Sequence, residues 1–195
     1  MIEIIAEIAQ GYEGSSKLAE LLTKGAVGAG ADSIKIQIVF ADELATPDYE
    51  YYRFFKSLEM DGKCWAEIVS RIQRSGKKAY FDVFGPKSLL LAKRLGADGV
   101  KLSTTEFYNR ALIKLAVEKF KRIFISIGGI PVEDIDDLIH TALRDHIPKC
   151  CLMYGFQSEP TPLEQNNLNK LCSYKQRYPD FRLGFMDHSS GEDEE

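Results

Sequence analysis

Short apolar runs alternate with amphipathic segments along the whole chain, and this alternation limits the fold more than any other feature. β-Branched and aromatic residues dominate the runs, which is typical of strands, and helix-forming segments follow them. The runs lie at residues 2–9, 33–40, 77–84, 99–104, 122–129, 150–156 and 182–190. Strands that are apolar on both faces and alternate with helices form buried parallel sheets. Seven such units in succession favour an α/β fold of the TIM (β/α) barrel type over a doubly wound sheet.

Helices are expected between the runs, and some carry clear terminal signals. Ser15 and Ser16 can cap the first helix, and Gly76 ends the second. The segment 47–55 (PDYEYYRFF) is predicted to be a longer, Tyr-rich connection. The later helices are expected over 87–96, 109–120, 132–146 and 162–179.

The length of 195 residues suits a single domain but falls short of the eight-unit barrel, which usually needs about 250 residues. We therefore expect residues 1–195 to be a single (β/α) barrel domain truncated after the predicted seventh strand, with about seven of eight units. The acidic residues at 192–195 resemble the first turn of a further helix. The alternative is a solvated acidic tail.

Charge and cysteine content exclude several functional classes. The formal net charge is −4, and the sequence has no Lys/Arg-rich run. Both features argue against nucleic acid or an anionic membrane as the main partner. No apolar stretch approaches the roughly 18–20 residues of a membrane span, and acids stand where a signal peptide carries Lys or Arg. The four cysteines show no CxxC spacing, and Cys150 and Cys151 are expected to be reduced core thiols. A cytoplasmic enzyme is the default expectation.

Polar residues at the ends of the predicted strands are the candidates for chemistry, because a (β/α) barrel carries its active site there. The sharpest signal is a pair of lysines, Lys35 and Lys101, inside apolar strands. A buried ammonium group is costly without an anion. The pair indicates either a site for an anionic substrate, balanced by Glu7 or Glu106, or a structural Lys–Glu pair. The other candidates are Gln37, Asp82, Thr104, Ser126, Tyr154, Gln157, Glu159, Asp187 and His188.

Two further features have a functional and a structural interpretation. Gly128 and Gly129 follow a strand, where backbone N–H groups could approach a phosphate, or they could form a plain turn. His188, next to Asp187, could be a metal ligand, a general base or a hydrogen-bonded structural histidine.

The strand-end residues resemble those of the sialic acid synthase (N-acetylneuraminate synthase) family, and the resemblance runs from residue 6 to 191. Its order and spacing are more specific than any one motif. It is carried by AEIAQGYEG (6–14), GADSIKIQIVFADELAT (30–46), GADGVKLSTTEFYN (96–109), ISIGG (125–129), EPTPLEQNNL (159–168) and GFMDHSSG (184–191).

The resemblance implies a transferase that condenses phosphoenolpyruvate with an N-acetylated hexosamine-type aldehyde and releases phosphate, in surface carbohydrate (nonulosonic acid) biosynthesis. It also implies a divalent metal, manganese or magnesium, and makes a homodimer plausible. The family's C-terminal antifreeze-like domain is expected to be absent from this chain.

The family's roles are carried over position by position. Glu7 matches a glutamate associated with the acceptor and catalysis, and Lys35 and Lys101 match lysines that hold the phosphoenolpyruvate anion. Gln37 and Glu106 match acceptor contacts. The remaining matches are Thr104 at the phosphate, Ser126 at phosphoenolpyruvate, Gln157 and Glu159 at substrate-binding positions, and His188 as one of two metal histidines.

Several positions depart from the family pattern. Asp82 stands where a threonine is expected near phosphate, and it could instead ligate a metal or mark a different donor or acceptor. Met186 replaces a serine, Tyr154 a histidine, Gln157 an asparagine and Glu159 a tyrosine. The second metal histidine belongs to an eighth strand that the chain does not reach, so little or no turnover is expected from these 195 residues.

Two other functions remain open from the sequence. One is a metal- or lysine-dependent aldolase-type barrel, with Lys35 or Lys101 as Schiff-base or proton-transfer group. The other is a degenerate, non-catalytic barrel that binds a sugar.

Overall fold

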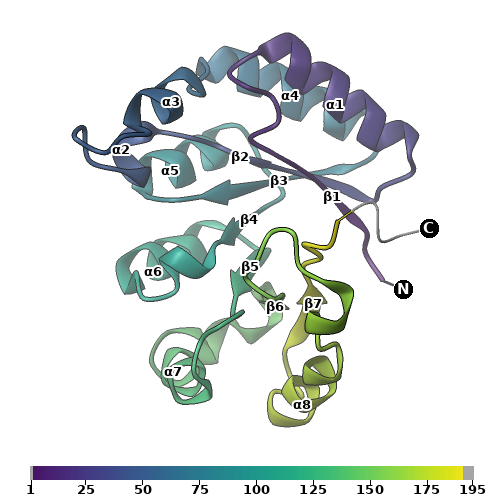
Figure 1. Ribbon diagram of the computed structural model, residues 1–195, viewed down its shortest axis with the longest axis vertical. Helices are drawn as coiled ribbons and strands as arrows, with labels where there is room; N and C mark the ends of the chain where they lie inside the picture. Colours follow the sequence, from purple (N-terminus) through teal and green to yellow (C-terminus); the bar gives the residue numbers. More distant parts are fainter. Residues whose placement is uncertain (1, 191–195) are drawn as a thin grey trace. The chain divides into compact units, whose positions relative to one another are not determined.

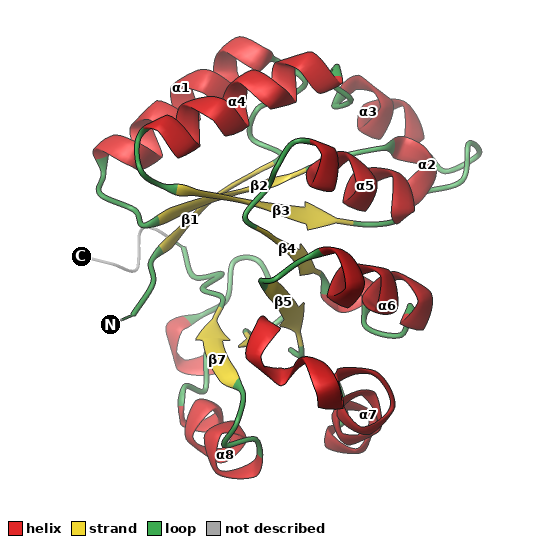
Figure 2. Cartoon of the chain, turned by 180° about the vertical axis from the view of Figure 1, so that it is seen from behind, coloured by secondary structure: helices red, strands yellow, loops and turns green. Residues whose placement is uncertain are grey.

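The computed structural model describes residues 2–190 and has the alternating strands and helices expected from the sequence (Figures 1 and 2). The strands are β1 (Ile5–Ala9), β2 (Ser33–Gln37), β3 (Lys78–Val83), β4 (Gly99–Leu102), β5 (Ile123–Ser126), β6 (Cys150–Tyr154) and β7 (Arg182–Phe185). The helices are α1 (Ser16–Gly28), α2 (Ala41–Leu44), α3 (Tyr52–Ser57), α4 (Gly62–Arg74), α5 (Pro86–Arg94), α6 (Arg110–Lys119), α7 (Val132–Leu138) and α8 (Asn169–Arg177).

The seven strands are ordered in the sheet as they are along the chain, from β1 to β7. Neighbouring strands run parallel, as in the pairs β1–β2, β2–β3, β5–β6 and β6–β7. This is an α/β fold with the topology of a (β/α) barrel carried through seven units, which confirms the predicted fold class. The acidic residues at 192–195 lie outside the described residues.

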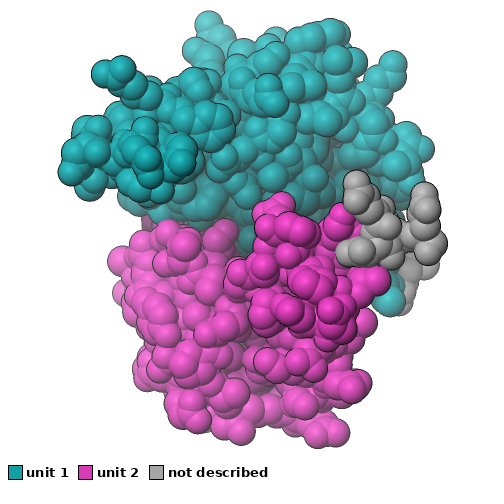
Figure 3. Space-filling view, viewed as in Figure 1, with its two compact units in different colours: residues 1–101 teal, residues 102–195 magenta. Residues whose placement is uncertain are grey.

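The chain divides into two compact units, residues 1–101 and 102–195, coloured separately in Figure 3. In the first unit, α1 and α4 lie side by side on one face of β1–β3 (Figures 1 and 2). Ser15 caps α1 by accepting a hydrogen bond from Leu18 N at 3.2 Å, as the sequence predicts. The apolar side of α4 packs into the core through Trp65, Ile68, Val69 and Ile72.

Two short helices that the sequence analysis did not predict lie near the Tyr-rich connection of the first unit: α2 precedes it, and α3 begins within it. α2 has four residues and α3 has six. Helices this short have little periodicity and depend on tertiary contacts for stability. Their place is therefore set by the polar contacts described below.

In the second unit, β6 is buried along its whole length, and Cys150 and Cys151 lie in its core as thiols that are not bridged by a disulfide, as expected. The helix expected over 132–146 continues beyond α7 only as a π-helical segment (Ile139–Leu143) and a 3₁₀ segment that contains Pro148. The helix expected over 162–179 is confined to α8. Asn167, just before α8, has φ +52°. This left-handed conformation interrupts a helix, so the residues before Asn167 do not belong to α8.

Strands also end earlier than their apolar runs predict. β5 ends at Ser126 rather than at 129, because Ile130 N bonds to Ile127 O in a turn and Gly129 has φ +76°. β7 ends at Phe185 rather than at 190. The residues beyond these ends belong to loops, and so do several of the candidate side chains.

No helix within residues 2–190 is both long enough and apolar enough to cross a membrane.

Candidate functional site

Four charged side chains from β1, β2, β3 and β4 meet inside the first unit. The parallel register makes Glu7 of β1 the direct neighbour of Lys35 of β2. Lys35 Nζ donates hydrogen bonds to Glu7 and, over 2.7 Å, to Asp82 Oδ2. Lys101 Nζ lies 3.2 Å from Asp82 Oδ2 and 3.1 Å from Oδ1. We call Glu7, Lys35, Asp82 and Lys101 the charge cluster.

Burial makes the pairing in the charge cluster obligatory. Asp82 is 1% exposed, Lys35 6% and Lys101 7%. The side chain of Glu7 is 42% exposed and forms the open side of the cluster. An unpaired buried charge would cost several kcal/mol, whereas here each buried ion faces an opposite charge.

Burial and the neighbouring charges together raise the pKa values of Lys35 and Glu7 and lower that of Asp82. Burial alone would lower the pKa of Lys35, but the carboxylates of Asp82 and Glu7 outweigh it and raise this pKa. Burial alone would raise the pKa of Asp82, but Lys101 and Lys35 outweigh it and lower this pKa. Lost hydration and the charge of Asp82 raise the pKa of Glu7, against the opposing lysines. Of the two carboxylates of the charge cluster, Glu7 is thus the more easily protonated.

A second polar layer lies beneath the charge cluster and was missed by the sequence analysis. Glu3 Oε1 accepts hydrogen bonds from Ser33 Oγ at 2.5 Å and from the hydroxyl of Tyr80 at 2.8 Å. Ser33 and Tyr80 are buried. The available signal was the alternation of strand residues, since Ser33 and Tyr80 lie two residues before Lys35 and Asp82 and so on the same face.

Gln37 ends β2, where its direct partner across the sheet is Asp82. The backbone carbonyl of Gln37 accepts a hydrogen bond from the hydroxyl of Tyr12 at 3.1 Å. Tyr12 is fully buried against the edge of Trp65, with 5.1 Å between ring centroids, and burial raises the pKa of its phenol. The loop after β1 is therefore fixed to the end of β2.

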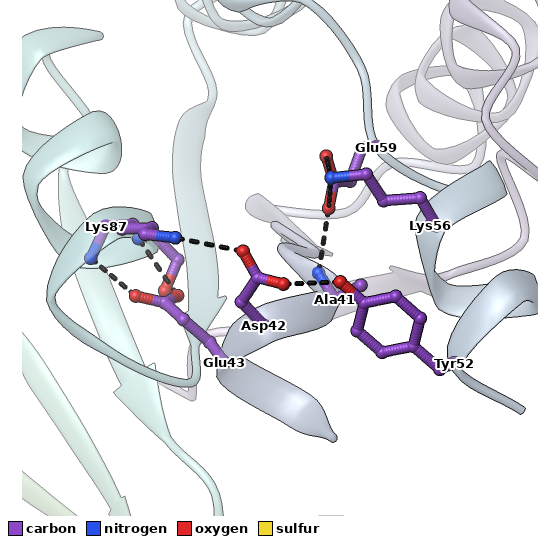
Figure 4. A network of polar contacts seen from close by, with 8 residues as sticks. Ala41, Asp42, Glu43, Tyr52, Lys56, Glu59 and Lys87 are labelled. Atoms are coloured by element: carbon purple, nitrogen blue, oxygen red, sulfur yellow. Dashed lines mark hydrogen bonds and ion pairs between the residues drawn. The ribbon is translucent and has the colours of Figure 1, made fainter. Parts of the chain in front are cut away.

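Helix α5, which follows β3, is capped by a carboxylate from α2 (Figure 4). Glu43 accepts from the backbone N–H of Lys87 at 2.5 Å and of Ser88 at 3.1 Å. Gly85 permits this approach, because a Cβ there would lie 2.5 Å from Glu43 Oε1. The N-terminal N–H groups of α5, an anion-binding position in many proteins, thus already hold an anion of the chain itself.

Further polar contacts hold α2 and α3 (Figure 4). Asp42 accepts from the hydroxyl of Tyr52 at 2.5 Å and from Lys87 Nζ at 3.2 Å. Glu59 binds Lys56 Nζ and the backbone N–H of Ala41. These contacts explain why short helices form just before the Tyr-rich connection and within it.

In the second unit the predicted residues form smaller groups. Thr104 Oγ1 and Ser126 Oγ lie 2.6 Å apart, and Ser126 is 1% exposed. Glu106 is half-buried, and its Oε2 accepts from Asn109 Nδ2 at 3.1 Å.

The glycine pair has a structural explanation. A Cβ on Gly128 would lie 2.1 Å from the carbonyl oxygen of Gly155, so only glycine fits beside that backbone. Gly129 supplies the left-handed residue of the turn. The geometry favours the plain turn over the phosphate-binding interpretation.

The loops after β6 and β7 carry the remaining candidates. Gln157 Nε2 donates to the carbonyl of Gly155 at 3.2 Å, and Glu159 is exposed. His188 Nδ1 lies 2.7 Å from the carbonyl oxygen of Phe156. This contact selects the tautomer with the proton on Nδ1 and leaves Nε2 as a potential ligand atom.

A complete metal site is not formed by residues 2–190. Within that range, no three His, Cys, Asp or Glu side chains gather as ligands. Asp187, beside His188, accepts hydrogen bonds from the backbone N–H and hydroxyl of Ser189. Asp82 faces two ammonium groups rather than other ligating side chains, which disfavours the metal-ligand interpretation of that residue.

The chain is similar in sequence to several known synthases. The chain is 24% identical over 202 residues to a pseudaminic acid synthase of Campylobacter jejuni, which covers 96% of this chain and 59% of that protein. It is 22% identical to the N-acetylneuraminate-9-phosphate synthase of Mus musculus, covering 96% and 56%. The chain spans between 53% and 59% of the length of the curated relatives it matches.

A solved structure and a family model agree with these relatives. The N-acetylneuraminic acid synthetase of Leptospira borgpetersenii superimposes with a TM-score of 0.89 at 23% identity, over 97% of this chain and 67% of that one, which establishes the shared fold. The model of the NeuB family matches residues 22–194. The chain, with its strand-end lysines, therefore belongs to the NeuB family, whose relatives named above are synthases.

Proposed function

We propose that this chain is the barrel portion of a synthase that condenses phosphoenolpyruvate with an N-acetylated hexosamine-type aldehyde in nonulosonic acid biosynthesis. The observation that carries the proposal is the presence of two buried lysines and a protonatable glutamate at one strand end of a NeuB-family chain. The names of the relatives, among them pseudaminic acid and N,N'-diacetyllegionaminic acid synthases, support the proposed class of product.

Lys35 and Lys101 are the proposed donor-binding groups. Ammonium groups attract both anionic parts of phosphoenolpyruvate, and a site with little water strengthens that attraction. The raised pKa of Lys35 keeps its ammonium group charged at neutral pH. Thr104 and Ser126, a hydroxyl pair in the second unit, are proposed as further donor contacts.

Glu7 is the proposed proton-transfer group. In the reaction, C3 of the enol attacks the aldehyde carbon, and the new alkoxide takes a proton. Water then adds at C2, and phosphate leaves as the C–O bond breaks. Because burial and the charge of Asp82 raise the pKa of Glu7, and its side chain is partly exposed, Glu7 is the proposed group that delivers this proton to the substrate.

The acceptor contacts are proposed to include Gln37, Glu106, Gln157 and Glu159. Gln37 ends the strand beside Asp82. Glu106 is half-buried, while Gln157 and Glu159 are exposed in a loop that a sugar can approach. Amide and carboxylate groups suit the hydroxyls of a hexosamine.

A divalent metal, manganese or magnesium, would polarise the acceptor aldehyde in such a reaction. His188 has the tautomer of a ligand, but residues 2–190 do not supply a set of three ligands. We propose that turnover requires residues beyond this barrel portion, in a longer form that assembles as a homodimer.

The charge cluster disfavours a lysine-dependent aldolase. Imine formation needs a neutral amine, whereas Asp82 and Glu7 raise the pKa of Lys35. Borohydride in the presence of pyruvate should therefore leave Lys35 unmodified, as judged by mass spectrometry.

The test measures donor binding and turnover separately. Calorimetric titration with phosphoenolpyruvate should give binding to this chain, and Lys101→Met should weaken that binding at least about tenfold, the effect of losing one close charge. Lys24→Met, an exposed lysine of the same unit, is the control.

Turnover is measured as phosphate release with a panel of N-acetylated hexosamines and added Mn²⁺ or Mg²⁺. We expect release from a form extended through an eighth strand and little from residues 1–195. A folded chain that does not bind phosphoenolpyruvate, together with an extended form that releases no phosphate, would contradict the proposed function and favour a non-catalytic sugar-binding barrel.

A further inference from the structure

The charge cluster contains its own anion at the place where the two lysines converge. Asp82 has one oxygen 2.7 Å from Lys35 Nζ, and both of its oxygens lie within 3.2 Å of Lys101 Nζ. Lys35 also binds Glu7. The positive charge available to a ligand is therefore smaller than the number of lysines suggests.

The carboxylate of Asp82 is held in this position by its surroundings. It lies in β3 between Phe81 and Val83, which are both fully buried, and it is itself 1% exposed. Its backbone is held by the parallel pairing with Gln37. Moving the carboxylate away from both ammonium groups would bury it unpaired, at a large cost in free energy.

The second source of positive potential next to β3 is also occupied. The N-terminus of α5 is capped by Glu43 (Figure 4). An anion that approaches the end of β3 thus meets two internal carboxylates, and neither the lysine pair nor the helix end attracts it at full strength.

We propose that Asp82 is a specificity-determining residue, an internal counter-ion that competes with the donor's phosphate for Lys35 and Lys101 and so keeps the affinity for phosphate-bearing donors low. This inference rests on the proposed function and deepens it. Glu7 could offset this loss of affinity, since its protonation when an anion binds would remove one negative charge from the charge cluster.

The test compares anion affinity in the 195-residue chain and in Asp82→Asn. Asparagine keeps the shape of aspartate and removes its charge. Phosphoenolpyruvate and inorganic phosphate should bind Asp82→Asn at least about tenfold more tightly, because one close negative charge is gone. Asp98→Asn is the matched control, with the same change in net charge in the same unit. Asp98 is exposed and binds Ala79 N and Gln73 rather than a lysine.

Two measurements keep the test decisive if Asp82→Asn is unstable. Phosphate should then raise its Tm far more than it raises that of the unsubstituted chain. The double variant Asp82→Asn/Lys101→Met removes both charges, so it should fold well and lose the gain in affinity.

The outcomes separate this inference from the proposed function. Equal or weaker phosphoenolpyruvate binding by folded Asp82→Asn, with binding by the unsubstituted chain intact, would overturn the role of Asp82 and leave the synthase proposal standing. Binding by neither folded protein would contradict the donor site itself and both proposals with it. If Asp98→Asn also bound phosphoenolpyruvate more tightly, the effect would come from the net charge of the chain rather than from Asp82, and the inference would be overturned.

Discussion

The two units of the molecule carry candidate residues of different kinds. In the first unit, Glu7, Lys35, Asp82 and Lys101 all lie on strands and form one buried ionic cluster. In the second unit, Ser126 and Tyr154 lie on strands, while Glu106, Gln157, Glu159 and His188 lie beyond strand ends. Side chains on strands are placed by register and alternation, whereas those on loops need contacts that vary with loop shape.

This difference has an energetic consequence. The ions of the first unit are buried, so removal of one leaves another uncompensated. The hydroxyl and amide groups of the second unit form neutral hydrogen bonds, each worth much less. Substitutions should therefore affect stability more in the first unit than in the second, except where glycine backbone packing intervenes.

The largest effect is expected from Lys35→Met, which leaves Glu7 without its lysine and Asp82 with one ammonium group. The free energy of unfolding should fall by about 3–5 kcal/mol. Urea denaturation followed by circular dichroism measures it. Lys24→Met, on the exposed side of α1, should change stability by no more than about 0.5 kcal/mol. Equal effects of the two substitutions would show that the cluster is not the stabilising feature proposed here.

The next effect tests backbone packing in the second unit. Gly128→Ala should lower the free energy of unfolding by about 1–3 kcal/mol, because the new Cβ would lie 2.1 Å from Gly155 O. Gly25→Ala is the control, since a Cβ at this helical position has open space, and alanine should stabilise α1 by about 0.5–1 kcal/mol. A neutral Gly128→Ala would mean that the turn relaxes without cost.

A smaller effect is expected in the acid limb, the acidic part of the curve of unfolding free energy against pH. Because the lysines lower the pKa of Asp82 in the folded state, its ionisation stabilises the fold above the unfolded pKa of about 3.9. That stabilisation is lost as the pH falls further. The raised pKa of Glu7 acts in the opposite sense and above about pH 4.3, so it does not mask the acid limb.

Below about pH 4, the unsubstituted chain should lose up to about 1.4 kcal/mol more per pH unit than Asp82→Asn, the slope for one proton. Urea denaturation at pH 5, 4, 3.5 and 3 measures the difference. Parallel acid limbs would indicate that the lysines do not hold Asp82 in its charged form.

The smallest effect is expected from Ser126→Ala, which removes the hydrogen bond to Thr104. The free energy of unfolding should fall by about 1 kcal/mol, the net value of a neutral hydrogen bond. Thr105→Ala, at an exposed neighbouring position, is the control. A loss as large as that of Lys35→Met would remove the proposed contrast between the two units.

Much of the fold was predictable because its signal is local. The seven apolar runs locate the seven strands, and Ser15 and Gly76 mark helix ends by their capping chemistry. The segments that were missed depend on distant contacts. α2 and α3 are held by Asp42, Glu43 and Glu59, and a local pattern does not reveal such partners.

The charge cluster was predicted in part. Lys35 and Lys101 stood out because charged residues in apolar strands must find partners, and Glu7 was one of the acids expected to balance them. Glu106 was the other, but it binds Asn109. Asp82 was noticed as an unusual anion, yet its position between the two lysines was not predicted.

The sequence by itself determined which strands exist, their order of succession, the face on which each charged residue lies, and the family to which the chain belongs. These follow from periodicity, capping and motif spacing, which act within short stretches of chain. Only the tertiary structure decided that Asp82 pairs with both lysines, that Glu43 caps the start of α5, and that Gly128 packs against the carbonyl of Gly155. Those outcomes depend on close contacts between residues far apart in the sequence. Strand register and burial fix these contacts, and no local pattern contains them.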